Sequence, residues 1–149
     1  MKLNKIAMLA ALTFLTSASG ALAQHGGSGG GDRLRCKAKG ADVEFQARYE
    51  VKKAATTAER RRFRVELEGG SSTGLTNGQQ LSILVDGANV GVLTVSAFNG
   101  GDVAGETRFE SRIKGGESLP FPSNFPAVST GSEVSLLNGD VTVIGCTFE

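Results

Sequence analysis

Residues 42–51 read DVEFQARYEV, and every second residue from Val43 onward is apolar or aromatic. Charged or amide residues stand between them. Because strand side chains point alternately to the two faces of a sheet, this pattern predicts a strand with one face in the core and one in water. Residues 62–68, RFRVELE, repeat the pattern, with Phe63, Val65 and Leu67 on the apolar side.

The same period of two recurs from residue 34 to the end of the chain, and no long segment has a helical period. Glycine-rich turn signals separate the runs, at residues 69–78, 86–87, 99–101, 115–116 and 138–139. Short strands with such turns are typical of sandwiches and barrels. We therefore predict an all-β fold, an antiparallel β-sandwich of seven to nine strands, with a small β-barrel as the alternative.

Residues 81–95, LSILVDGANVGVLTV, form the clearest hairpin signal. Asp-Gly is a strong two-residue turn sequence, because a type I′ turn needs positive φ at both central positions. With Asp86 and Gly87 as the turn, three apolar pairs are expected on one face: Val85–Ala88, Ile83–Val90 and Leu81–Val92. Nothing in the hairpin is reactive, so we interpret it as part of the core.

The first 24 residues, MKLNKIAMLAALTFLTSASGALAQ, have the features of a signal peptide. Lys2 and Lys5 precede an apolar run that is too short to span a bilayer, and Ala21-Leu22-Ala23 is a cleavage signal. We predict a signal peptide at residues 1–23, a flexible Gly/Ser-rich tether at 24–32, and a single β-sandwich domain at 33–149. The expected location is secreted or periplasmic, with no transmembrane segment after cleavage.

The charge of the mature chain excludes one class of partner. Loss of Lys2 and Lys5 lowers the count of Lys and Arg from 16 to 14, against 15 Asp and Glu, for a formal charge of about −1. No global field therefore attracts nucleic acid. We expect no nucleic-acid partner, and the partner itself is open: an anionic envelope component or another protein.

Cys36 and Cys146 are the two cysteines, one near each end of the predicted domain. In an oxidising compartment they are expected to form a disulfide. A metal or redox site is disfavoured, because the spacing is not Cys-x-x-Cys and the one histidine, His25, lies in the tether. We therefore predict no metal and no cofactor.

Without a histidine in the domain, Ser-His-Asp and Cys-His catalysis are excluded. Two acids among Asp102, Glu106 and Glu110 could still meet to act on a glycoside or to hold calcium. We expect no enzyme, and a small carboxylate-dependent enzyme stays as a rival interpretation.

Arg60, Arg62 and Arg64 form the one basic cluster, in the sequence ERRRFR. One interpretation is ion pairing with Glu66 and Glu68, which share their face. The other is a binding patch for a polyanion, such as an acidic polysaccharide or a lipid headgroup.

Phe121 and Phe125 lie in SLPFPSNFPAV, where three prolines keep the chain extended and out of a central strand. We favour the interpretation that they are anchors tucked under a loop, since exposed phenylalanine pairs are uncommon on monomers. The alternative is an exposed aromatic binding contact.

The succession of ARYEV, RRFRVELEG and VDGANVGVLTV, then a proline stretch and a closing strand, resembles a class of small secreted bacterial β-domains that are uncharacterised. The resemblance implies a fold and no activity. Our hypothesis is a secreted, non-enzymatic module with a binding or structural role in the cell envelope or extracellular space. The alternatives are the carboxylate-dependent enzyme and a β-barrel carrier of a small apolar ligand.

Overall fold

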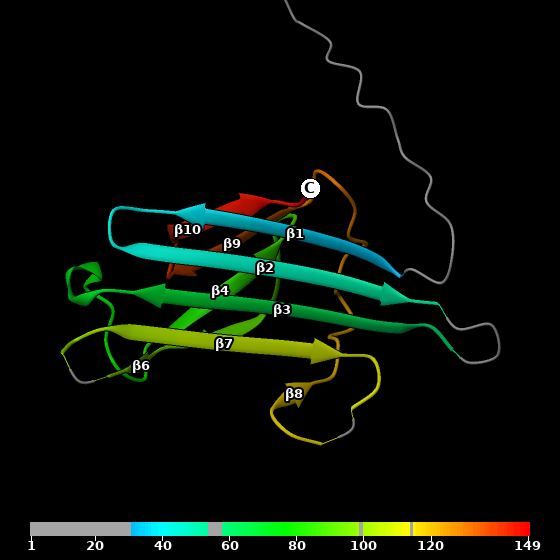
Figure 1. Ribbon diagram of the computed structural model, residues 1–149, viewed down its shortest axis with the longest axis horizontal. Coiled ribbons are helices and arrows are strands. Elements are labelled where there is room, and N and C mark those ends of the chain that lie inside the picture. Colours follow the sequence, from blue (N-terminus) through cyan, green and yellow to red (C-terminus); the bar gives the residue numbers. More distant parts are fainter. Residues whose placement is uncertain (1–30, 54–57, 99, 114) are drawn as a thin grey trace, which may run out of the picture.

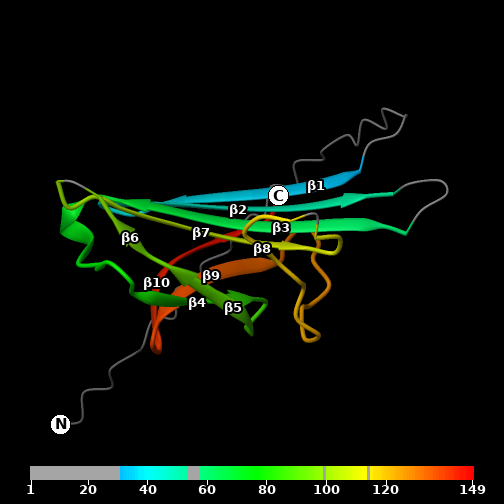
Figure 2. The same cartoon turned by 90° about the horizontal axis from the view of Figure 1, so that it is seen from below.

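The protein is described by a computed structural model that covers residues 31–53, 58–98, 100–113 and 115–149. Two sheets pack face to face in a β-sandwich (Figures 1 and 2), which confirms the predicted fold class. The predicted signal peptide and all but the last two residues of the predicted tether lie outside the described residues. The first strand begins at Asp32, one residue before the expected domain boundary.

The large sheet has the strand order β1-β2-β3-β7-β6, and the short β8 pairs in parallel with β7. All its other neighbours are antiparallel. Its strands are β1 (Asp32–Lys39), β2 (Val43–Lys52), β3 (Arg60–Gly69), β6 (Ser96–Ala97), β7 (Val103–Glu110) and β8 (Ser118–Leu119).

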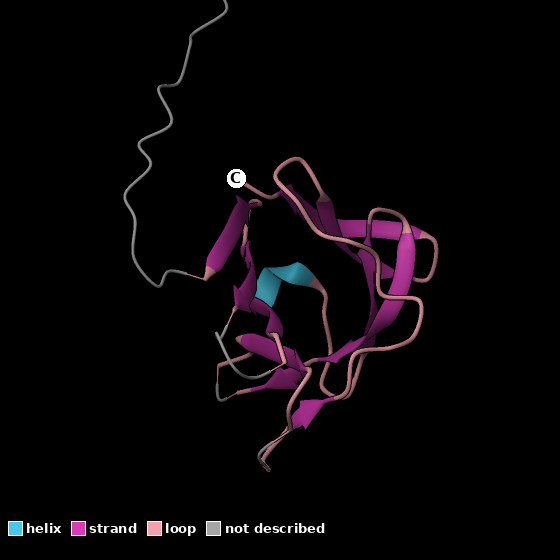
Figure 3. Cartoon of the chain, turned by 90° about the vertical axis from the view of Figure 1, so that its right-hand side faces the viewer, coloured by secondary structure: helices cyan, strands magenta, loops and turns pink. Residues whose placement is uncertain are grey.

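The small sheet is antiparallel, with the order β10-β9-β4-β5. Its strands are β4 (Gln80–Val85), β5 (Ala88–Thr94), β9 (Glu133–Asn138) and β10 (Val141–Thr147). Eight strands in the described part of the chain have six residues or more, within the predicted range, and β6 and β8 add two strands of two residues each. A single 3₁₀ turn, η1 (Ser71–Thr73), follows β3 and is visible in the end-on view of Figure 3.

The core lies between the two sheets and is built from the inward set of each alternating strand. Phe45, Phe63 and Leu67 of the large sheet and Ile83 and Leu136 of the small sheet are completely buried. Each fully buried side chain of this size contributes about 1.5–3 kcal/mol of hydrophobic stabilisation. The alternation leaves the other face of the large sheet to charged residues.

The hairpin turn is where the sequence predicts it, since Asp86 and Gly87 have φ values of 48° and 79° and Val85 pairs with Ala88. Further along, the predicted pairing is wrong by one residue. A β-bulge inserts Val90, so Ile83 pairs with Gly91 instead. A slip of one residue exchanges the faces of a strand. Two consequences follow: Val92, expected in the core, is 43% exposed, and Leu93 is completely buried.

The residue that follows the bulge packs closely against the opposing sheet. The ring of buried Phe109 packs against the backbone of Gly91, and a Cβ there would lie 2.8 Å from its Cζ. Glycine permits this close approach, and the φ of 156° at Gly91 is one that other residues rarely adopt.

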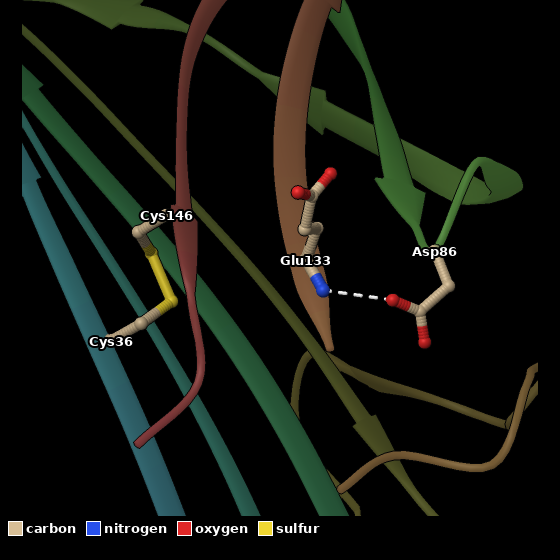
Figure 4. Close-up of a disulfide and its surroundings, with 4 residues drawn as sticks. All are labelled: Cys36, Asp86, Glu133 and Cys146. Atoms are coloured by element: carbon tan, nitrogen blue, oxygen red, sulfur yellow. Dashed lines mark hydrogen bonds between the residues drawn. A yellow bond between two sulfur atoms is a disulfide. The ribbon is translucent and has the colours of Figure 1, made fainter. Parts of the chain in front are cut away.

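The predicted disulfide is present: Cys36 of β1 is bonded to Cys146 of β10, with the Cα atoms 5.7 Å apart (Figure 4). It connects an edge strand of the large sheet to an edge strand of the small sheet. The same figure shows Asp86, whose carboxylate accepts a hydrogen bond from the Glu133 backbone N–H at 2.8 Å. The hairpin turn is thereby fixed to the start of β9.

Candidate anion-binding surface

The outer face of the large sheet is not covered by any element of the described chain (Figure 2). Residues on this face alternate with core residues, so their identities follow from the strand pattern and their neighbours from the strand register. Between Glu44 and Glu50 of β2 and between Arg62 and Leu67 of β3, half-buried residues alternate with buried ones, and the half-buried residues there are polar or charged.

The register places four arginines side by side across four strands. Arg35 pairs with Arg48, Arg48 with Arg64, and Arg64 with Arg108. Neighbouring strands lie about 4.8 Å apart, so the line of arginines, hereafter the arginine row, extends for about 14 Å at the backbone. Like charges directly opposite each other on a sheet destabilise it, so this arrangement works against folding stability.

Carboxylates flank the arginine row on both sides. On one side, Arg33, Glu50, Arg62 and Glu110 are paired across the strands, with alternating charge. On the other side, the corresponding line is Lys37, Gln46, Glu66 and Glu106. Each flanking line is two residues away along the strands, about 7 Å. The arginine row is therefore the line across these four strands that carries cations alone, and each flanking line mixes cations with carboxylates.

Two arginines of the row are held by ion pairs. Arg64 Nη2 lies 2.6 Å from Glu66 Oε1 and 2.8 Å from Glu106 Oε2, and Arg108 Nη2 lies 2.7 Å from Glu106 Oε1. The hydrogen bond that Arg64 donates to Glu106 lowers the pKa of Glu106, and the same bond raises the pKa of Arg64. Glu106 is therefore ionised at neutral pH, and it orients both guanidinium groups.

The other two arginines have no carboxylate within ion-pairing distance among the described residues. Arg35 is exposed at the edge strand. Arg48 is half-buried, and with the Gln46 amide oxygen turned toward it, the amide accepts hydrogen bonds from Arg48 Nε and Nη2. The Nε of Arg64 is buried and has no acceptor in the described part of the chain. The row thus holds donor capacity that the protein itself does not use.

A surface hollow of about 190 Å³ lies over the row, lined by Arg48, Arg64 and Arg108 together with Glu50 and Arg62. Four of its five lining side chains are guanidinium groups. Arginine presents five N–H donors in a planar fork, which matches carboxylate, sulfate and phosphate oxygens. The chemistry of the hollow is that of an oxyanion site.

Two of the three arginines predicted from the sequence are occupied by one buried carboxylate. Arg60 Nη2 and Arg62 Nε lie 3.2 and 2.7 Å from the oxygens of Glu110. Burial alone would raise the pKa of Glu110, but the hydrogen bonds and charges of Arg60 and Arg62 outweigh it and lower that pKa. Glu110, absent from the predicted pairing, is thus the partner of Arg60 and Arg62, whereas Arg64 pairs with the expected Glu66.

The structure adds Arg35, Arg48 and Arg108 to Arg64, and sequence reasoning missed all three. Arg48 and Arg108 are each the one arginine of their strand, so no local cluster marks them, whereas Arg35 lies in β1 with Arg33, Lys37 and Lys39. Only the register brings them together: β7 lies next to β3 although about 40 residues separate Arg64 from Arg108 in the chain.

Phe121 and Phe125 are half-buried and pack against the core. Phe125 stacks with Tyr49 and makes an edge contact with Phe63, at ring-centroid distances of 6.4 and 5.1 Å. The guanidinium carbon of Arg61 lies 5.1 Å from the Phe121 ring centroid, a cation–π contact. These rings are anchors of the loop, in agreement with the favoured interpretation.

The acids considered for catalysis do not form a proton-sharing pair. Glu106 and Glu110 are both on the outer face of β7, but each is bound to arginine and each has a lowered pKa. Asp102 immediately precedes β7 and lines a hollow of about 660 Å³ at the end of the large sheet. Within residues 31–149 outside the gaps, no three His, Cys, Asp or Glu side chains gather as metal ligands.

Comparison of the chain with protein-family models, with curated proteins and with solved structures gave no match. The resemblance noted above therefore rests on the strand and turn pattern alone. Among the described residues, no helix is long and apolar enough to cross a membrane.

Proposed function

We propose that this protein is a secreted, non-enzymatic binding module whose outer large-sheet face holds an anionic component of the cell envelope or extracellular space. The arginine row is the observation that carries the proposal. Aligning four arginines costs folding stability, and two of them, Arg35 and Arg48, have no carboxylate partner in the described chain. An anionic partner would offset that cost.

Two features support a partner outside the cytoplasm. The sequence of residues 1–23 has the pattern of a signal peptide, and Cys36–Cys146 is the kind of bond that persists in oxidising compartments. The secreted or periplasmic location remains part of this proposal.

The rival functions have less support. A carboxyl group that acts as a general acid near neutral pH needs a raised pKa, whereas Glu106 and Glu110 have lowered ones. A carrier of an apolar ligand needs an unfilled apolar interior, whereas large inward side chains such as Phe45, Phe63 and Leu67 are completely buried in the core.

Retention of the mature protein on immobilised dextran sulfate tests the proposal. With a formal charge of about −1, the protein as a whole has no net attraction to a polyanion. Binding at low salt would therefore come from a local cationic surface. We expect retention at about 20 mM salt and release well below 1 M, because exposed charges are screened. A protein that passes through at low salt would refute the proposal.

A further inference from the structure

We infer that the partner is a single linear polyanion lying along the arginine row, crossing β1, β2, β3 and β7 at right angles to the strands. The inference rests on the proposed function and names the kind of ligand that this face takes. It is an acidic polysaccharide with carboxylate or sulfate groups at regular intervals.

The carboxylates beside the row favour one extended chain over a membrane. Glu50 and Glu110 alternate with Arg33 and Arg62 on one side of the row, and Glu66 and Glu106 lie on the other side with Lys37, each line about 7 Å away along the strands. A planar anionic surface would meet these carboxylates together with the arginines. A chain one residue wide contacts the row and leaves the carboxylates at its sides.

The composition of the face favours a saccharide over a lipid or a single-stranded nucleic acid. From β1 to β7, its residues are Arg, Lys, Glu, Gln and Ala, with no aromatic or large apolar side chain among them. Proteins that bind single-stranded nucleic acid use aromatic side chains for stacking, and interfacial anchors use apolar ones. Guanidinium groups can bind carboxylates and sulfates without any aromatic or apolar side chain.

The flanking glutamates position the arginines without saturating them. The ion pairs of Arg64 and Arg108 use the Nη2 nitrogen of each guanidinium, so other N–H donors of each group remain for a ligand. Arg48, between Arg35 and Arg64, lines the hollow and has no carboxylate partner in the described chain. A polyanion would thus find in succession two guanidinium groups oriented by carboxylates and one, Arg48, that is held by the Gln46 amide and carries an unneutralised charge.

The length of the row sets the length of the ligand that fills it. Four arginines at the strand spacing of about 4.8 Å correspond to about four charged groups in line. Oligosaccharides of galacturonate, which carry one carboxylate per sugar, are the probe. We expect affinity to rise steeply from dimer to tetramer and only slightly from tetramer to octamer.

The variant Arg48→Gln/Arg108→Gln removes two charges from the row, and Lys37→Gln/Lys39→Gln removes two from the same face outside it. Because the row variant loses two guanidinium groups that would contact the ligand, we expect its tetramer affinity to fall by about a hundredfold or more. The tetramer affinity of the control variant should fall by about threefold or less, because its lysines lie beside the ligand and their charges are screened by salt. Urea unfolding verifies that both variants are folded.

The outcomes separate the two proposals. Equal losses in both variants, or affinity that grows evenly to the octamer, would overturn the row as the binding track while leaving an anion-binding face in place. Tighter binding to vesicles with phosphatidylserine than to the tetramer would overturn the saccharide assignment. Absence of binding to every polyanion, dextran sulfate included, would remove the proposed function as well.

Discussion

Reduction of the Cys36–Cys146 disulfide should weaken the fold by a predictable amount without abolishing it. The bonded residues are 110 positions apart. The chain-entropy relation gives about 5 kcal/mol at 25 °C for a loop of this length, and typical measured values are about 2–4 kcal/mol. We expect the free energy of unfolding to fall by about 3–4 kcal/mol, an effect that acts mainly through the unfolded chain.

The folded state should persist after reduction because other contacts hold the same strands. The Glu149 N–H donates to the Arg35 carbonyl at 3.1 Å, and the Arg35 N–H donates to the Glu149 carbonyl at 3.4 Å. The core between the sheets also has its own completely buried side chains, such as Phe45 and Leu136. A domain of this size can fold on such a core.

Urea unfolding with and without a phosphine reductant measures the effect, and Cys36→Ala/Cys146→Ala is the matched variant. The dependence of the unfolding free energy on urea should steepen on reduction, because the unfolded chain without the crosslink is more expanded. Identical unfolding curves in the two conditions, or two reactive thiols in the denatured protein before reduction, would refute the reasoning.

Three further predictions concern single positions. Gly87→Val should cost about 1–2 kcal/mol or more in urea unfolding, because a β-branched residue resists a φ of 79°; unchanged stability would argue against the turn. Gly91→Ala should cost about 1–3 kcal/mol, because its Cβ would lie 2.8 Å from the ring of buried Phe109, and the variant Gly91→Ala/Phe109→Leu should recover part of any such loss. The lowered pKa values of Glu106 and Glu110 stabilise the fold above their ordinary carboxyl range; that stability is lost as the pH falls from about 4.5 through the lower folded-state values, so the melting temperature of Glu110→Gln should depend less on pH there than that of the parent.

The sequence predicted the features that depend on local chemistry. Alternation in residues 42–51 and 62–68 identified two strands and their buried faces, and Asp86-Gly87 identified the turn. The bulge at Val90 escaped prediction, and the residue after it packs against Phe109 of the opposing sheet, a contact that alternation along one strand does not reveal.

The candidate site escaped prediction for a related reason. Arg64 was noticed because Arg60 and Arg62 stand beside it in the chain, yet those neighbours are bound to Glu110. Arg108 joins the arginine row through the pairing of β3 with β7, and Arg48 and Arg35 join it through the pairing of β2 with β3 and of β1 with β2. Alternation determines the face of a residue, whereas only the strand order and register determine which residues lie beside it.

The position of the disulfide has a mechanical consequence. β1 is an edge strand, and a pull on the chain that precedes Asp32 would separate it from β2 one residue pair at a time, beginning with Asp32 and Val51. Separation would stop at Cys36, because the covalent bond transfers the load to β10 and the second sheet. Only residues 32–35 can be peeled away, so tension at this end releases Arg35 and leaves Arg48, Arg64 and Arg108 in line.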